Sequence, residues 1–182
     1  MYEVEVKVPA DLEAVRARLE ELDATPVDDV AQEDTYYDAP HRSFPETDEA
    51  LRIRTERAET GADEVRLTYK GPLVDDASKT REEVETAVAS GEKIDTVLTK
   101  LGFEPAATVR KDRERFALEE YTITLDSVED VGEYVEVETE VDDEADLESA
   151  REGAYDVLER LGRDPDEQVR TSYLGLLLAD DA

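Results

Sequence analysis

The sequence contains no cysteine and only one histidine, His41. Without cysteine, neither a disulfide framework nor a thiolate metal site can form, and one imidazole cannot build a multi-histidine zinc site. Any metal ion that this chain binds must therefore be held by oxygen ligands, which hard divalent cations prefer.

The sequence also lacks a long apolar run. No stretch approaches the roughly 20 apolar residues of a membrane span, and the first residues alternate in polarity where a secretory signal peptide would be apolar. With 182 residues, the chain has the length of one ordinary domain. We therefore expect a single domain over residues 1–182 that is soluble and cytoplasmic and has no membrane partner.

Basic residues are few, because 21 lysines and arginines stand against 51 acidic residues and give a formal charge of −30. We still expect a folded chain, since 39% of the residues are hydrophobic and occur in regular patterns. The negative charge opposes binding to nucleic acids, so we expect no nucleic-acid partner. An anionic substrate must instead meet a local cluster of bases. Acidic residues spread over the whole sequence are typical of halophilic proteins, and we interpret this chain as one.

Alternation of apolar and polar residues, as in the opening MYEVEVKV, predicts most of the secondary structure. Strands are predicted at 1–8, 30–40, 50–57, 64–72, 79–88, 108–118, 121–128 and 133–141. Helices are predicted at 11–23, 91–102 and 146–161, followed by an apolar piece at 171–178. Hairpin-like connections, such as the turn at 59–63, favour antiparallel pairing and an α+β fold.

Each predicted strand has one apolar face and one charged face. If the apolar faces point inward, the charges lie in solvent; if the apolar faces pack under helices, the charged faces line a tunnel. Composition favours the tunnel, because the charged faces collect eight of the 21 bases: Lys7, Arg52, Arg54, Arg66, Lys70, Arg81, Lys111 and Arg113. Buried bases are costly unless paired, and a triphosphate with divalent cations would complete such a lumen.

Short motifs in a fixed order carry a resemblance to a known family. They are EVEVK at 3–7, LRIR at 51–54, LTYKGP at 67–72, KTREEVET at 79–86, RKDRERF at 110–116, LDSVEDVGEYVEVE at 125–138 and SYLGLL at 172–177. Over nearly its full length the chain resembles the CYTH domains, the triphosphate tunnel metalloenzymes. Within that family it is most similar to the branch named for class IV adenylate cyclases.

The resemblance implies an eight-stranded antiparallel β-barrel with helices packed outside, commonly in a homodimer, that binds a triphosphate with Mg²⁺ or Mn²⁺. The implied metal ligands are Glu3, Glu5, Glu136 and Glu138. The implied phosphate-binding residues are Lys7, Arg52, Arg54, Lys70, Arg81, Lys111 and Arg113. Catalytic roles fall to Lys7, Lys111, Arg113 and Asp126, and Glu83 is expected to orient neighbouring bases.

For several other groups the expectation is structural. Arg66 and Arg115 are less secure members of the site than the other bases. Tyr36, Tyr37 and His41 lie where a nucleoside could enter, but rim packing is the favoured interpretation. The acidic run 142–144 is expected to be solvated surface at a helix start.

The function expected from the resemblance is metal-dependent conversion of ATP to cyclic AMP and pyrophosphate. The nearest alternative keeps the site but hydrolyses tripolyphosphate, thiamine triphosphate or a nucleoside triphosphate. A second alternative is a module that binds triphosphate or polyphosphate without turnover. A halophilic β-domain with all charges in solvent is the remaining alternative. For the expected reaction, no residue stands out in the sequence as a general base.

The charge balance generates a prediction about salt. Because the acidic residues repel one another at low ionic strength, the melting temperature should rise as KCl is increased from low to molar concentrations, where the screening length falls to about 3 Å. Thermal melts followed by circular dichroism measure this rise. An unchanged melting temperature would contradict the halophilic interpretation.

Overall fold

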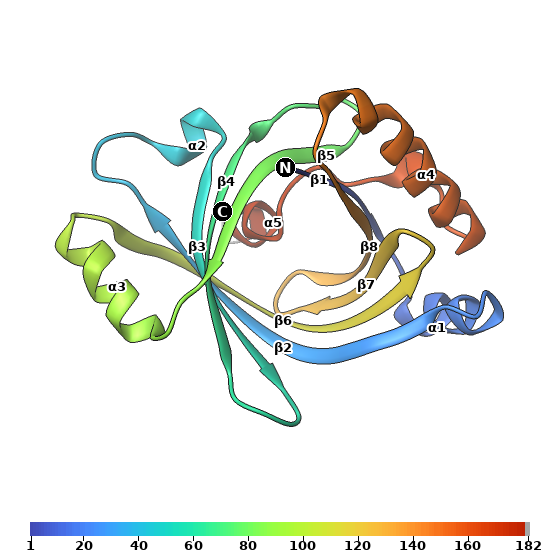
Figure 1. Cartoon of the computed structure of the whole chain (residues 1–182), viewed down its shortest axis with the longest axis horizontal. Coiled ribbons are helices and arrows are strands. Elements are labelled where there is room, and N and C mark those ends of the chain that lie inside the picture. Colours follow the sequence, from blue (N-terminus) through green and yellow to red (C-terminus); the bar gives the residue numbers. More distant parts are fainter. Residues whose placement is uncertain (181–182) are drawn as a thin grey trace.

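The computed structural model describes residues 1–180, so the last two residues of the expected domain lie outside it. Eight antiparallel strands form a closed barrel in the order β1-β5-β4-β3-β2-β6-β7-β8 (Figure 1). The predicted α+β barrel is thereby confirmed. The strands are β1 (Tyr2–Pro9), β2 (Thr25–Asp38), β3 (Ala50–Ala58), β4 (Glu64–Leu73), β5 (Lys79–Ala87), β6 (Glu104–Leu118), β7 (Tyr121–Val128) and β8 (Gly132–Val141).

Strands β2 and β6 are longer than the alternation predicted. They pair with each other from Thr25 opposite Ala117 to Asp38 opposite Glu104, with two irregularities in register. Each added stretch contains a proline and lacks strict alternation, which is why the sequence pattern did not mark it. The long pairing builds one wall of the barrel.

The main apolar core lies outside the barrel wall. Helices α1 (Leu12–Glu21) and α4 (Leu147–Arg160) cover the same side of the barrel (Figure 1). The outward faces of β1, β7 and β8 pack beneath these helices with buried residues such as Val6, Ile123 and Leu158. Because side chains alternate along a strand, packing these apolar faces outward turns the charged faces inward.

Two further helices cover other parts of the wall. Helix α3 (Gly91–Lys100) packs over β3 through a smaller apolar cluster that includes Ile53 and Leu98. Helix α2 (Phe44–Thr47) was not predicted, because four residues containing a proline show no helical period. Within residues 1–180, none of the helices has the length and apolar character needed to cross a membrane.

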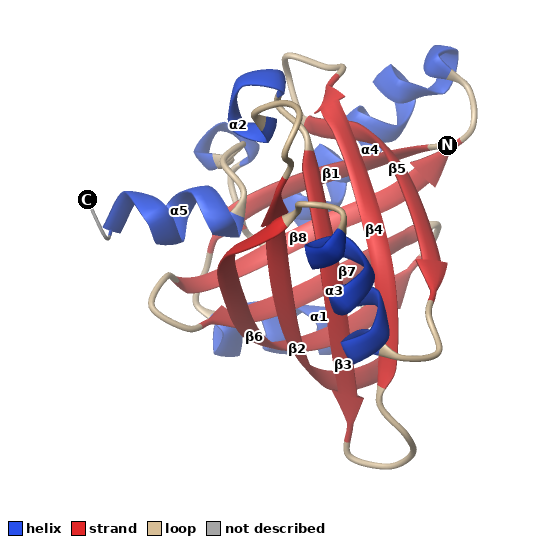
Figure 2. Cartoon of the chain, turned by 90° about the vertical axis from the view of Figure 1, so that its left-hand side faces the viewer, coloured by secondary structure: helices blue, strands red, loops and turns tan. Residues whose placement is uncertain are grey.

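The chain after α4 returns to the barrel. The short 3₁₀ helices at Glu144–Asp146 and Pro165–Glu167 flank α4, and α5 (Tyr173–Asp180) follows. Figure 2 shows α5 beside one end of the barrel. The buried ring of Tyr173 anchors this helix in an apolar cluster with Val109 and Val128.

Candidate active site

The inward strand faces line one cavity of about 920 Å³. Ten of the twelve predicted site residues line it: Glu3, Glu5, Arg52, Arg54, Lys70, Arg81, Lys111, Arg113, Glu136 and Glu138. The other two, Lys7 and Asp126, are 0% exposed and lie outside this lining. Nine of the chain's 21 bases line the cavity. Seven of them belong to the eight that the strand pattern placed on the charged faces, and the other two are Lys79 and Arg115.

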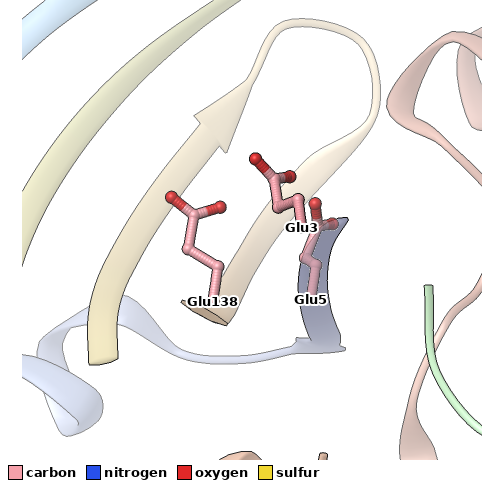
Figure 3. Close-up of side chains that lie close together, drawn as sticks. All are labelled: Glu3, Glu5 and Glu138. Atoms are coloured by element: carbon pink, nitrogen blue, oxygen red, sulfur yellow. The ribbon is translucent and has the colours of Figure 1, made fainter. Parts of the chain in front are cut away.

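Three carboxylates converge within this cavity. Glu3 and Glu5 on β1 and Glu138 on β8 each offer an oxygen, and these oxygens lie within 4.8 Å of one another (Figure 3). The strand register produces this arrangement, because Glu5 is the direct cross-strand partner of Glu138. We name Glu3, Glu5 and Glu138 the carboxylate trio.

The trio is only partly compensated. Although burial acts the other way, Lys79 and Lys7 hold the pKa of Glu5 well below its usual range. Burial, followed by the charge of Glu138, raises the pKa of Glu3 well above its usual range. Burial also raises the pKa of Glu138 to about 7, with Glu136 and Glu5 adding to the rise against the opposing effect of Arg113. Crowded carboxylate oxygens of this kind are the donor set that Mg²⁺ and Mn²⁺ bind, so the residues present fit such an ion.

Glu136, the fourth predicted ligand, has a different partner. Its Oε2 accepts a hydrogen bond from Arg113 at 3.2 Å. Arg113 also donates twice to Asp126, at 2.7 Å in each bond. The Arg113 guanidinium is thus fixed between two carboxylates, and metal binding by Glu136 stays a prediction.

Asp34 is a functional candidate that the sequence interpretation missed. It is 1% exposed and accepts two 2.7 Å hydrogen bonds from Arg54. Arg52 and Lys111 each lie 3.8 Å from its Oδ2. Although burial acts the other way, Arg54 and Arg52 hold its pKa well below the usual range. Acidic residues on both faces of this strand, Glu33 and Asp34, hid which one points inward.

Lys79 is the second missed residue. It stands opposite Glu5 across the β1–β5 pair, and its Nζ lies 3.1 Å from Glu5 Oε1. The alternation that placed Arg81 on the charged face also places Lys79 there, so the signal was present in the sequence. Nearby, Lys70 forms a 2.5 Å ion pair with Glu83, the residue expected to orient bases.

One cavity base has an unused donor. The Nε of Arg52 is buried and has no hydrogen-bond partner among residues 1–180. A buried guanidinium donor without an acceptor is costly, and a phosphate oxygen is an acceptor that would satisfy it. Anion binding by Arg52 stays a prediction.

The C-terminal segment covers the two predicted residues that do not line the cavity. Lys7 Nζ donates to the Thr171 carbonyl at 2.6 Å and lies 4.1 Å from the centre of the Tyr173 ring. The Tyr173 hydroxyl donates to Asp126 at 2.7 Å. Burial lowers the pKa of Lys7 to about 8. Phosphate binding by Lys7 stays a prediction.

The less secure candidates, Arg66 and Arg115, also line the cavity. Arg115 donates twice to Asp28, and the exposed side chain of Arg66 lies 3.4 Å from Glu64. The Tyr37 hydroxyl donates to Asp95 on α3, and His41 packs edge-on against Phe103. These contacts agree with packing roles for Tyr37 and His41. Tyr36 and Tyr37 both line the cavity.

The acidic run agrees with its expected structural role. The carboxylate of Asp143 accepts a hydrogen bond from the backbone N–H of Ala145 at 2.9 Å. It thereby caps the 3₁₀ helix that precedes α4.

A closed antiparallel barrel with carboxylates and bases facing its lumen defines the class of this protein. The CYTH domain family matches residues 1–173, and the chain belongs to that family. A Methanocaldococcus jannaschii protein with a provisional adenylate cyclase name is 37% identical over 177 residues, covering 97% of this chain and 98% of that protein. Adenylate cyclase CyaB of Aeromonas hydrophila is 26% identical over 175 residues, which cover 94% of this chain and 86% of that protein. The solved structure of PH1819 from Pyrococcus horikoshii has a TM-score of 0.91 and 40% sequence identity. The match covers 98% of this chain and 99% of that one.

The raised pKa of Glu138 generates a prediction about stability. An ordinary glutamate titrates near pH 4.3. The folded state keeps the Glu138 proton to about pH 7, so the metal-free protein should lose stability as pH rises between these values. Glu138→Gln removes this titration and should be more stable than wild type at pH 8 by up to about 4 kcal/mol, with the difference vanishing near pH 4.

Urea unfolding in the presence of EDTA measures the difference. Glu133→Gln, on the exposed part of the same strand, serves as the matched control and should show none. Adding Mg²⁺ should stabilise wild type more than Glu138→Gln. A Glu138→Gln protein that is less stable than wild type at pH 8 without metal would contradict the repulsion within the trio.

Proposed function

We propose that the protein is a divalent-metal-dependent enzyme that converts ATP to cyclic AMP and pyrophosphate. The observation that carries the proposal is the lumen itself, in which a carboxylate trio faces a set of bases that includes the unsatisfied donor of Arg52. The adenylate cyclase names of relatives 37% and 26% identical to this chain also support it.

In this reaction the 3′-hydroxyl oxygen bonds to the α-phosphorus, the bond from that phosphorus to the bridging oxygen of pyrophosphate breaks, and the hydroxyl proton is released. Mg²⁺ or Mn²⁺, held by Glu3, Glu5 and Glu138, would supply Lewis-acid chemistry for the hydroxyl and the departing oxygens. The protein itself must bind the triphosphate, orient it and balance the charge that moves to the leaving group.

The bases of the lumen are suited to that task. Arg52 and Arg54 are directed by Asp34 behind them, so their guanidinium groups need little reorganisation when phosphate oxygens arrive. Burial, together with the charges of Arg113 and Arg54, lowers the pKa of Lys111 to about 7. A bound triphosphate would supply the negative charge that this crowded group of bases lacks.

Product analysis tests the proposal directly. The protein is incubated with labelled ATP or tripolyphosphate at high salt with Mg²⁺ or Mn²⁺, and the products are separated by chromatography. We expect cyclic AMP and pyrophosphate from ATP. Release of inorganic phosphate from either substrate without cyclic AMP would replace the cyclase by the triphosphatase alternative. Binding of either substrate without turnover would indicate the non-catalytic module.

Two variants separate the metal site from the phosphate site. Glu5→Gln should lower the activity at modest Mn²⁺ and recover part of it in excess Mn²⁺, because a hard-cation ligand is lost. Arg52→Ala should weaken triphosphate binding by about 1.5–3 kcal/mol, and added metal should not restore it. Glu33→Gln and Arg110→Ala, an exposed ion pair on the outer face, are the matched controls. Full activity in both lumen variants would show that the proposed site is wrong.

A further inference from the structure

Lys79 places a fixed positive charge beside the carboxylate trio. Its ammonium lies 3.1 Å from Glu5 Oε1, and its side chain is 11% exposed. Lys79 and Glu5 are direct partners in the β1–β5 register, so their side chains project side by side into the lumen. An internal cation thus lies next to the place where a divalent ion fits.

The backbone before Lys79 is anchored from outside the barrel. Arg170 in the C-terminal segment donates to the carbonyls of Ser78 and Asp75 at 3.2 and 2.7 Å. Arg151 on α4 donates to both carboxylate oxygens of Asp75 at 3.0 Å. These contacts hold the backbone just before β5, and the pairing with β1 holds the backbone of Lys79 itself. The Lys79 ammonium therefore stays within reach of the trio.

We propose that Lys79 is a built-in counter-ion of the carboxylate trio, which a divalent ion must displace and which a bound triphosphate draws away. The inference rests on the metal site of the proposed function and describes how that site is regulated. In this proposal Lys79 contacts Glu5 in the free protein and phosphate oxygens once a triphosphate is bound.

The physical basis is competition between cations. An ammonium and a divalent ion that share Glu5 repel each other, so the metal alone binds more weakly than it would to an uncompensated trio. When a triphosphate occupies the lumen, its oxygens offer the ammonium another partner and release Glu5 for the metal. Metal and triphosphate therefore strengthen each other's binding by the same factor, as thermodynamic linkage requires.

Mn²⁺ binding to the metal-free protein tests the proposal, with free Mn²⁺ measured by electron paramagnetic resonance. Lys79→Met keeps much of the side chain's length but removes the charge, and it should bind Mn²⁺ about tenfold or more tightly than wild type. Lys93→Met makes the same change in net charge on the exposed face of α3 and should remain within about twofold of wild type. Lys79→Arg keeps the charge and should bind Mn²⁺ as wild type does.

An ATP analogue with a methylene group between the α- and β-phosphorus atoms cannot lose pyrophosphate, and it tests the coupling between metal and triphosphate binding. It should increase the affinity of wild type for Mn²⁺ and increase that of Lys79→Met by a smaller factor. The proposal is overturned if Lys79→Met binds Mn²⁺ no more tightly than wild type, or if neither protein binds Mn²⁺. It is also overturned if Lys79→Arg binds Mn²⁺ as tightly as Lys79→Met.

The Mn²⁺-binding measurement and the assay of catalytic activity can fail separately. If wild type turns over no triphosphate but Lys79→Met still gains Mn²⁺ affinity, the proposed function fails and the counter-ion role stands. If wild type forms cyclic AMP and Lys79→Met gains no affinity, the function stands and Lys79 is only a cross-strand ion pair.

Discussion

The barrel depends on the pairing of charges that would be too costly to bury alone. An ion transferred from water to a protein interior loses several kcal/mol of solvation, which only close opposite charges and hydrogen bonds can offset. The lumen meets this demand with two-bond pairs, Arg54 with Asp34 and Arg113 with Asp126, and with the single ion pair of Lys70 and Glu83. Glu3 and Glu138 of the carboxylate trio, and the bases around Lys111, are left with excess charge of one sign. A metal ion and a triphosphate offer compensation for these groups.

This arrangement is possible because the apolar core lies elsewhere. Helices α1 and α4 pack on the outer faces of β1, β7 and β8, and the stability gained there does not require apolar side chains in the lumen. Strand alternation links the two regions, since each residue buried under a helix fixes the inward direction of its neighbours. The C-terminal segment joins the regions again, because it contacts Lys7 and Asp126 inside and anchors the start of β5 outside.

The sequence predicted the strand faces well because the alternation in β1, β3, β4 and β8 is regular, and ten of twelve predicted site residues line the cavity. Asp34 escaped prediction because its strand carries acids on both faces, and parity alone could not choose between them. The burial of Lys7 under the C-terminal segment could not be predicted. It depends on the hydrogen bond between Lys7 and the Thr171 carbonyl, 164 positions apart, which leaves no local sequence pattern. The direct pairing of Lys79 with Glu5 likewise depends on register, which only the closed barrel sets.

We propose that a metal ion on the carboxylate trio and a triphosphate on the facing bases complete the lumen. Crystals grown with Mn²⁺ and a methylene-bridged ATP analogue, measured at the manganese absorption edge, test it most directly. We expect an anomalous peak about 2.0–2.3 Å from oxygens of Glu3, Glu5 or Glu138, with phosphates against Arg52 and Arg54. Manganese bound only at the acidic outer surface, with the analogue outside the barrel, would contradict it.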